Sequence, residues 1–187
     1  MQPIGPLMHE HRLIERMVGL VAEQAEAIKR GIAPDSEFIE DAVEFFRVYA
    51  DRCHHGKEEE LLFKELGSKD LTPELSAIMQ ELIEEHKQGR SLVASLYQAN
   101  KKYRKEGGDS QSVVELLNEL SSFYPAHIEK EDKHFFFPVM EYFTREQMDS
   151  MLEDFNTFDR QMIHELFLQR VDNWEKVSEQ SGSGNAG

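Results

Sequence analysis

Two stretches of the sequence pair a histidine with a glutamate four residues later. His54 precedes Glu58, and His127 precedes Glu131. On a helix, this spacing places both side chains on one face, one turn apart. An imidazole and a carboxylate placed in this way can bind one metal ion together, or the carboxylate can bridge two. A single such pair in a glutamate-rich helical protein is usually an exposed ion pair, so only the repetition is informative.

Two further histidines, His11 and His86, occupy single positions in other helical segments. All four histidines have apolar residues three and four positions away, so we expect them to face the interior. Buried imidazoles and carboxylates without partners destabilise a fold, whereas a metal cluster satisfies them together. Histidine and carboxylate ligands without cysteine suit iron, manganese or zinc, and two carboxylates able to bridge indicate a dinuclear site.

Helical periodicity covers nearly the whole chain and predicts the elements that position these residues. The apolar pattern predicts helices at residues 7–30, 36–66, 73–107 and 110–138. Asp35 or Ser36 and Thr72 are expected caps, and Thr144 with Gln147 forms a capping box that opens a fifth helix. Because the connections are short and the helices long, we expect an all-α, up-down four-helix bundle with an additional C-terminal helix.

The sequence predicts one helical domain at residues 1–177, with the bundle at about 7–140 and the appended helix at about 144–177. The Gly/Ser-rich residues 178–187 are expected to be a disordered tail.

We find no apolar run long enough to cross a membrane and no secretory signal. The lone Cys53 fits a reducing compartment, so the expected location is cytoplasmic. The net charge of −15 argues against nucleic-acid binding.

Four stretches of sequence contain these histidines in a characteristic order and spacing. They are Glu10-His11-Arg12, Cys53-His54-His55-Gly56-Lys57-Glu58-Glu59, Glu85-His86 with Gly89-Arg90, and His127-Ile128-Glu129-Lys130-Glu131-Asp132 followed by Phe137-Pro138. Together they resemble the hemerythrin-like (HHE cation-binding) family over roughly residues 7 to 140. The resemblance implies a four-helix bundle around two iron ions joined by an oxo or hydroxo bridge, with manganese or zinc as other possible metals. It also implies that His11, His54, His86 and His127 are terminal ligands and that Glu58 and Glu131 bridge the metals.

The third helix departs from the pattern of classical oxygen-carrying hemerythrins, which have two histidines one turn apart there. In this chain Leu82 and Arg90 lie one turn before and after His86. This departure leaves either an open coordination site or a ligand from elsewhere, and it argues against reversible oxygen carriage. His164 in the fifth helix is a candidate replacement, although a surface or outer-shell position fits it better.

Two other arrangements compete with this ligand set. His55 with Glu59 forms an alternative register in the second helix, but the motif favours His54 with Glu58 and leaves His55 facing solvent or an outer partner. Glu131 with His134 forms the Glu-x-x-His pattern of ferritin-type proteins, which need a second such element.

The favoured function is a non-haem di-iron binding protein that takes up dioxygen, nitric oxide or iron for sensing, storage or detoxification. The alternative is a di-iron oxidoreductase that acts on peroxide or nitric oxide. No general acid or base outside the ligand set is evident, so the sequence does not decide whether the protein is an enzyme. Tyr49 and Tyr124 lie near ligand turns and are candidates for a hydrogen bond to a bound ligand. No nucleic-acid or membrane partner is expected, and a protein partner is left open.

Overall fold

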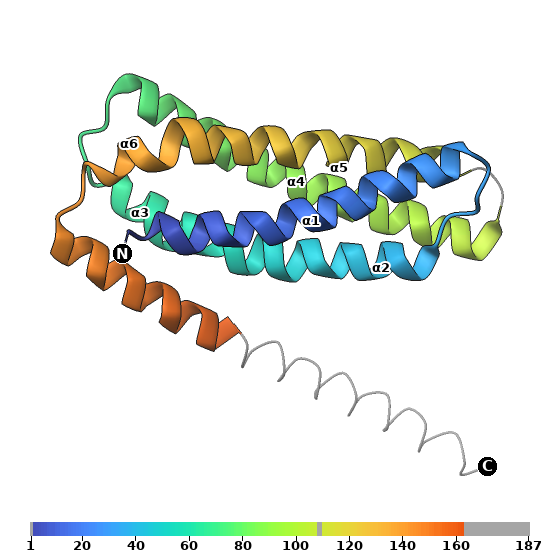
Figure 1. Ribbon diagram of the computed structural model, residues 1–187, viewed down its shortest axis with the longest axis horizontal. Helices are drawn as coiled ribbons and strands as arrows, with labels where there is room; N and C mark the ends of the chain where they lie inside the picture. The colour runs from blue at the N-terminus through green and yellow to red at the C-terminus, as the bar shows by residue number, and fades with distance from the viewer. Residues whose placement is uncertain (1, 108–109, 163–187) are drawn as a thin grey trace, which may run out of the picture.

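Four helical rods run alternately up and down, as Figure 1 shows for a computed structural model that describes residues 2–107 and 110–162. The predicted all-α bundle is confirmed, and the described residues contain no strand. The first rod is α1 (Ile4–Lys29), and the second comprises α2 (Ser36–Phe45), η1 (Phe46–His55), η2 (Glu58–Leu62) and α3 (Phe63–Leu66). The third rod is α4 (Pro73–Glu106), and the fourth comprises α5 (Gln111–Lys130), η3 (Glu131–Phe135) and α6 (Phe136–Met140). The first rod packs against the fourth, and the second packs against the third.

Three of the helices begin at caps that the sequence predicts. The Asp35 side chain accepts a hydrogen bond from the backbone N–H of Phe38 at 3.1 Å. Thr72 caps α4 in the same way, directly before Pro73. Thr144 and Gln147 exchange the two hydrogen bonds of a capping box, and residues 145–162 form the additional helix. Its predicted extension to residue 177, the expected tail at 178–187 and His164 lie outside the described residues.

The second and fourth rods are not uniformly α-helical. The segments η1, η2 and η3 are π-helical, so their backbone hydrogen bonds reach from residue i to i+5. A π-helix turns by less than the roughly 100° per residue of an α-helix, so neighbouring residues can face more nearly the same way. Such segments occur frequently at functional sites, and here they contain His54, His55, Glu58 and Glu131.

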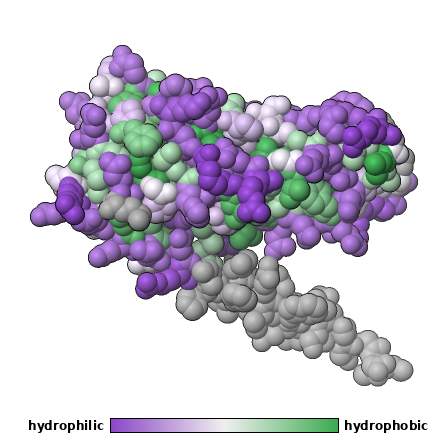
Figure 2. Space-filling view, viewed as in Figure 1, coloured by the Kyte–Doolittle hydropathy of each residue, from purple (hydrophilic) through white to green (hydrophobic). Residues whose placement is uncertain are grey.

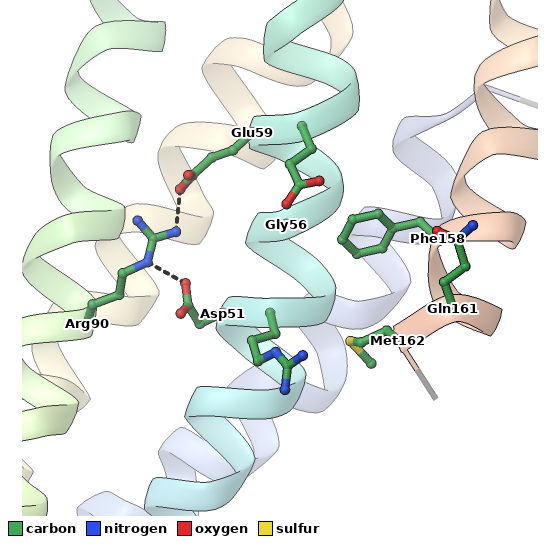
Figure 3. Close-up of a pocket in the computed structure, with 9 residues that line it drawn as sticks. Asp51, Gly56, Glu59, Arg90, Phe158, Gln161 and Met162 are labelled. Atoms are coloured by element: carbon green, nitrogen blue, oxygen red, sulfur yellow. Dashed lines mark hydrogen bonds and ion pairs between the residues drawn. The ribbon is translucent and has the colours of Figure 1, made fainter. Parts of the chain in front are cut away.

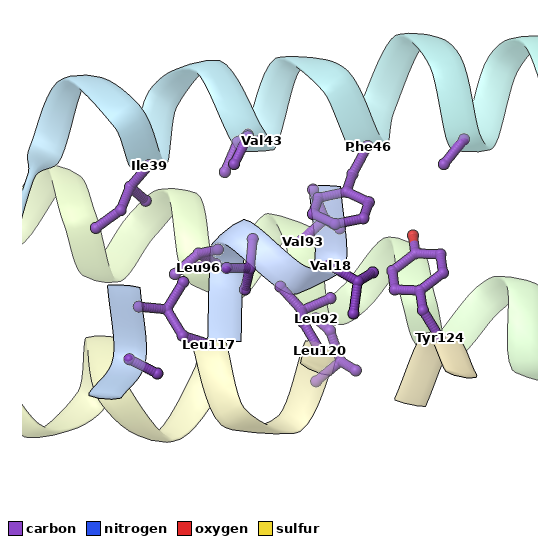
Figure 4. Packing of buried hydrophobic residues seen from close by; sticks show 14 of the residues in the cluster. Val18, Ile39, Val43, Phe46, Leu92, Val93, Leu96, Leu117, Leu120 and Tyr124 are labelled. Atoms are coloured by element: carbon purple, nitrogen blue, oxygen red, sulfur yellow. The ribbon is translucent and has the colours of Figure 1, made fainter. Parts of the chain in front are cut away.

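Two apolar clusters divide the interior of the bundle. The larger one joins α1, α2, η1, α4 and α5 and includes Val18, Phe46, Val93 and Leu120 (Figure 4). The smaller one joins the start of α1, η2, α3, the start of α4, α6 and helix 145–162. The buried histidines and glutamates belong to neither cluster and come from the stretches of chain that join them.

The face of the molecule seen in Figure 2 is dominated by hydrophilic side chains, as the net charge of −15 leads one to expect. Among the described residues, no helix combines the length and apolarity needed to cross a membrane.

Candidate metal centre

Seven polar side chains meet in the interior, and none of them is more than 2% exposed. They form two adjacent groups in which one nitrogen or oxygen atom from each residue lies within 4.8 Å of the others. The first group contains His11, His54, Glu58 and Glu131, and the second contains His55, His86 and His127. The structure therefore brings together all six residues that the sequence singles out, and it adds His55.

The two glutamates each reach both groups of histidines. Glu58 has one carboxylate oxygen 3.5 Å from Nε2 of His54 and the other 3.4 Å from Nε2 of His86. Glu131 likewise lies 3.2 Å from Nε2 of His11 and 3.4 Å from Nε2 of His127. Ligand atoms that share one ion at about 2.1 Å lie roughly 3 Å apart. Each carboxylate thus spans the two groups of histidines at distances that metal ligands have from one another.

The atoms that face this centre have no other use in the fold. All four carboxylate oxygens of Glu58 and Glu131, and Nε2 of both His86 and His127, are buried without a hydrogen-bond partner. Nε2 of His11 lies only 2.8 Å from Nε2 of His54. Buried polar atoms in native proteins are almost always paired, and a group of unpaired ones is costly. Cations that accept lone pairs from these nitrogens and oxygens would satisfy all of them, so the residues fit a metal centre.

Four of the five histidines are held from outside by a carboxylate that is itself held by a cation. We call each such carboxylate–cation pair an anchor. The anchors are Asp132 with Arg12 for His11, Glu10 with Lys57 for His54, Glu59 with Arg90 for His86, and Glu85 with Lys130 for His127. In each case Nδ1 of the histidine donates to the carboxylate, over 2.7 to 2.9 Å. This bond fixes the tautomer in which the Nε2 lone pair points at the centre.

His55 corrects the sequence interpretation, which placed it against solvent or an outer partner. It is 2% exposed, and its ring stacks on that of His86 with the centroids 3.9 Å apart. An α-helix would separate His54 and His55 by about 100°, but η1 ends with both rings inside. His55 therefore supplies the fifth imidazole that the third helix lacks, where Leu82 is buried in the smaller apolar cluster.

A comparison with protein families agrees with this geometry. The family model of the hemerythrin HHE cation-binding domain matches residues 2–136. The chain belongs to the hemerythrin HHE cation-binding domain family. No curated protein and no solved structure matches it. Membership and the buried clusters together show a cation-binding HHE domain.

The pKa values of this HHE domain show how strongly the buried groups interact. Burial, and then the charge of Glu131, raise the pKa of Glu58. Burial opposes the charge on Glu131 too, but His127, His11 and His86 hold its pKa well below the usual range. Burial lowers the pKa of His54 to about 4, despite its bond to Glu10. Burial also opposes protonation of His11, yet Asp132 and Glu131 raise its pKa to about 9. A cation bound at the centre would therefore replace a proton on His11.

Two residues of the competing arrangements, Glu59 and His134, lie outside the centre. Glu59 bonds to Nδ1 of His86, the nitrogen that faces away from the centre, and to Arg90. The pair of His54 with Glu58, rather than His55 with Glu59, therefore supplies the carboxylate that faces inward. His134 is exposed, so the ferritin-type pattern gains no support from it. The anchors were not foreseen, although Glu10 and Glu85 directly precede two of the singled-out histidines in the sequence.

Helix 145–162 of the HHE domain lies against the second rod beside the centre. Lys57 is 0% exposed and donates to Glu10 and to Asp159 of this helix. A Cβ atom added to Gly56 would lie only 2.7 Å from Cζ of Phe158, so glycine is required for this close approach. A pocket of about 340 Å³ lies beside this contact (Figure 3). Arg90, bonded to Asp51 and Glu59, lines one side of it, and Phe158 and Met162 line the other.

Proposed function

We propose that this HHE domain holds two iron ions between its two groups of histidines and uses them to bind dioxygen or nitric oxide, in sensing or detoxification. The observation that carries the proposal is the position of Glu58 and Glu131. Each carboxylate reaches a histidine of both groups, and none of the four carboxylate oxygens of these two glutamates has a hydrogen-bond partner. Bridging two cations is the arrangement that uses all of these atoms.

The donor set supports iron. Imidazole and carboxylate ligands without thiolate suit iron, manganese and zinc, and iron alone of these commonly exchanges an electron with dioxygen or nitric oxide. When bound, ferrous iron would supply the electron density that such a ligand accepts. The anchors hold the imidazoles in position, and the burial of the seven side chains excludes bulk water.

The two cation positions would differ in their protein ligands. His11 and His54 with the two glutamates give four ligands at one position, whereas His55, His86 and His127 with the same glutamates give five at the other. Neither position reaches the six ligands of an octahedral ion from the protein alone, so each has room for a molecule from solution. These open places support ligand binding rather than a purely structural metal.

The direct test is the metal content and optical spectrum of the purified protein. We expect two iron ions per chain and, after oxidation, the near-ultraviolet absorption of a bridged ferric pair. Protein that contains zinc alone, or a single iron with no such absorption, would contradict the proposal. Mixing the reduced protein with dioxygen or peroxide then separates binding from turnover, because a stable new band indicates binding and continuous peroxide loss indicates an oxidoreductase.

A further inference from the structure

A pocket of about 250 Å³ opens between η1 and α4, directly beside His55. Its floor consists of side chains that are at most 3% exposed, namely Phe46, His55, Val93 and Tyr124. Its rim is charged and includes Asp51 and Arg90, which form an ion pair at 2.7 Å. The pocket therefore joins solvent to the histidine group that contains His55 through an apolar chamber.

The Tyr124 hydroxyl is a hydrogen-bond donor in the wall of this pocket. Tyr124 is 2% exposed, and its ring stacks on Phe46 with the centroids 4.7 Å apart. Its hydroxyl makes no hydrogen bond to the residues that the structure describes and is not among their fully buried polar atoms, so it is in contact with the open pocket. In Figure 4 it points from α5 towards the second rod. A tyrosine hydroxyl in this position can donate a hydrogen bond to a molecule in the pocket. Burial raises the pKa of Tyr124, so the hydroxyl stays protonated and can donate a hydrogen bond to a ligand.

A buried polar atom without a partner also lies beside this pocket. Nδ1 of His55 has no hydrogen-bond partner and lies 3.5 Å from the nearest carboxylate oxygen of Asp51. The other four histidines of the centre all use Nδ1 in an anchor. His55 thus combines a place in the centre with a place in the wall of the pocket.

Gly89 keeps the wall next to the Tyr124 hydroxyl open. A Cβ atom added to Gly89 would lie 3.7 Å from that hydroxyl and 3.1 Å from Cε1 of Phe123. A side chain at this position would therefore fill space beside the donor and press on a neighbouring ring. The absence of a side chain on α4 leaves room there for another molecule.

We propose that this pocket is a binding site for a small uncharged molecule with a hydrogen-bond-accepting atom, held by the Tyr124 hydroxyl beside His55 on its way to the metal centre. The inference rests on the proposed function and adds the place and chemistry of the ligand. The apolar floor disfavours ions, because burying an unpaired charge is costly. The volume exceeds the roughly 30 Å³ of one water molecule several times. Dioxygen, nitric oxide and hydrogen peroxide share the required chemistry.

The first experiment fills the pocket and uses two probes on the full chain. Xenon under pressure should appear in crystals of the unaltered protein between Phe46, Val93 and Tyr124, whatever metal is present. Val93→Phe should exclude xenon and should slow nitric oxide association with the reduced, iron-loaded protein at least tenfold. Leu13→Phe is the matched control, because it makes the same kind of change at a position that is 37% exposed on α1; it should leave both probes unchanged.

The second experiment makes smaller changes, so that the test does not depend on whether Val93→Phe folds. Gly89→Ala should slow nitric oxide association two- to fivefold. Tyr124→Phe keeps the ring but removes the donor, so nitric oxide should dissociate about fivefold faster, as expected for the loss of one hydrogen bond. Unchanged kinetics in all folded variants that retain their iron, or the absence of xenon from the pocket, would overturn the inference. A normal iron content in the same variants would leave the proposed di-iron centre standing.

Discussion

The two sides of the candidate centre are supported differently. On the first side, His11 and His54 both have anchors, and the cation of one anchor, Lys57, also binds Asp159 of helix 145–162. On the second side, His86 and His127 have anchors as well, but His55 has none: its ring packs against those of His54, His86 and His127, and an Asp51 oxygen lies 3.5 Å away. The side that would have fewer ligands is thus anchored throughout, and the side with more ligands contains one imidazole without an anchor.

This difference separates two ways of placing a ligand. An anchored imidazole is oriented by its own hydrogen bond, which also raises its basicity. His55 is placed by the π-helical backbone of η1 and by the rings around it. We therefore expect the anchored residues to determine metal affinity and His55 to respond to what occupies the neighbouring pocket.

The largest effect is expected where both sides depend on one residue. Glu131→Ala or Glu58→Ala removes a carboxylate that reaches both histidine groups, so iron content should fall from two per chain to well below one, as measured by elemental analysis. Glu129→Ala is the control, because Glu129 is exposed and pairs only with Lys133. Full iron in the Glu131→Ala protein would show that the carboxylate does not bridge.

A second large effect concerns the buried cation on the anchored side. Lys57→Met leaves Glu10 and Asp159 without their shared partner; because these carboxylates are 13% and 39% exposed, solvent offsets part of the loss, and the cost should be about 1–3 kcal/mol. The free energy of unfolding in urea should fall by this order. Lys133→Met, at an exposed lysine, should change it little. Equal stability of the two variants would mean that Lys57 contributes no more than a surface charge.

Removing one anchor should weaken metal binding without removing a metal ligand. Glu85→Ala takes away the acceptor for Nδ1 of His127, and loss of such a partner typically lowers metal affinity 10- to 100-fold. Competition with a chelator of known affinity measures this change. Glu84→Ala, at the preceding position and bonded to Lys87 on the surface, is the matched control. An unchanged affinity for the Glu85→Ala protein would remove the basis for calling these pairs anchors.

The smallest effect is expected at the unanchored imidazole. His55→Ala should lower iron affinity less than tenfold, whereas His86→Ala should lose an ion, because His86 is oriented by Glu59 and His55 by no comparable bond. Parallel chelator titrations compare the two. Equal losses would show that His55 binds as firmly as the anchored histidines, and the contrast between the two sides would then be wrong.

The sequence predicted what depends on local chemistry and regular periodicity. Asp35, Thr72 and Thr144 were recognisable as caps because a short polar side chain directly precedes each apolar pattern. His54 with Glu58 and His127 with Glu131 were recognisable because a spacing of four marks one helical face.

The sequence did not predict His55, because its inward direction depends on a π-helical segment that an apolar pattern with a period of 3.6 does not reveal. It also did not predict the anchors, because each joins residues from different rods, as Glu85 does with His127. His164 was a candidate for the missing ligand, but it lies outside the described residues, so that alternative stays a prediction.

The π-helical segment η1 has a consequence for insertions and deletions. Each of its hydrogen bonds spans one residue more than an α-helical bond, so deleting one residue between Phe46 and Arg52 would allow the segment to return to α-helical geometry. A π-helical stretch fits one extra residue into the same rotation, so side chains beyond the deletion would keep their direction. Within the segment, His54 and His55 would then be separated by about 100°. We expect such a protein to keep the packing of α2 and the inward direction of Glu58 but to turn one of the two neighbouring histidines away from the centre. In related sequences, the length of this stretch would therefore indicate whether both histidines can face the interior.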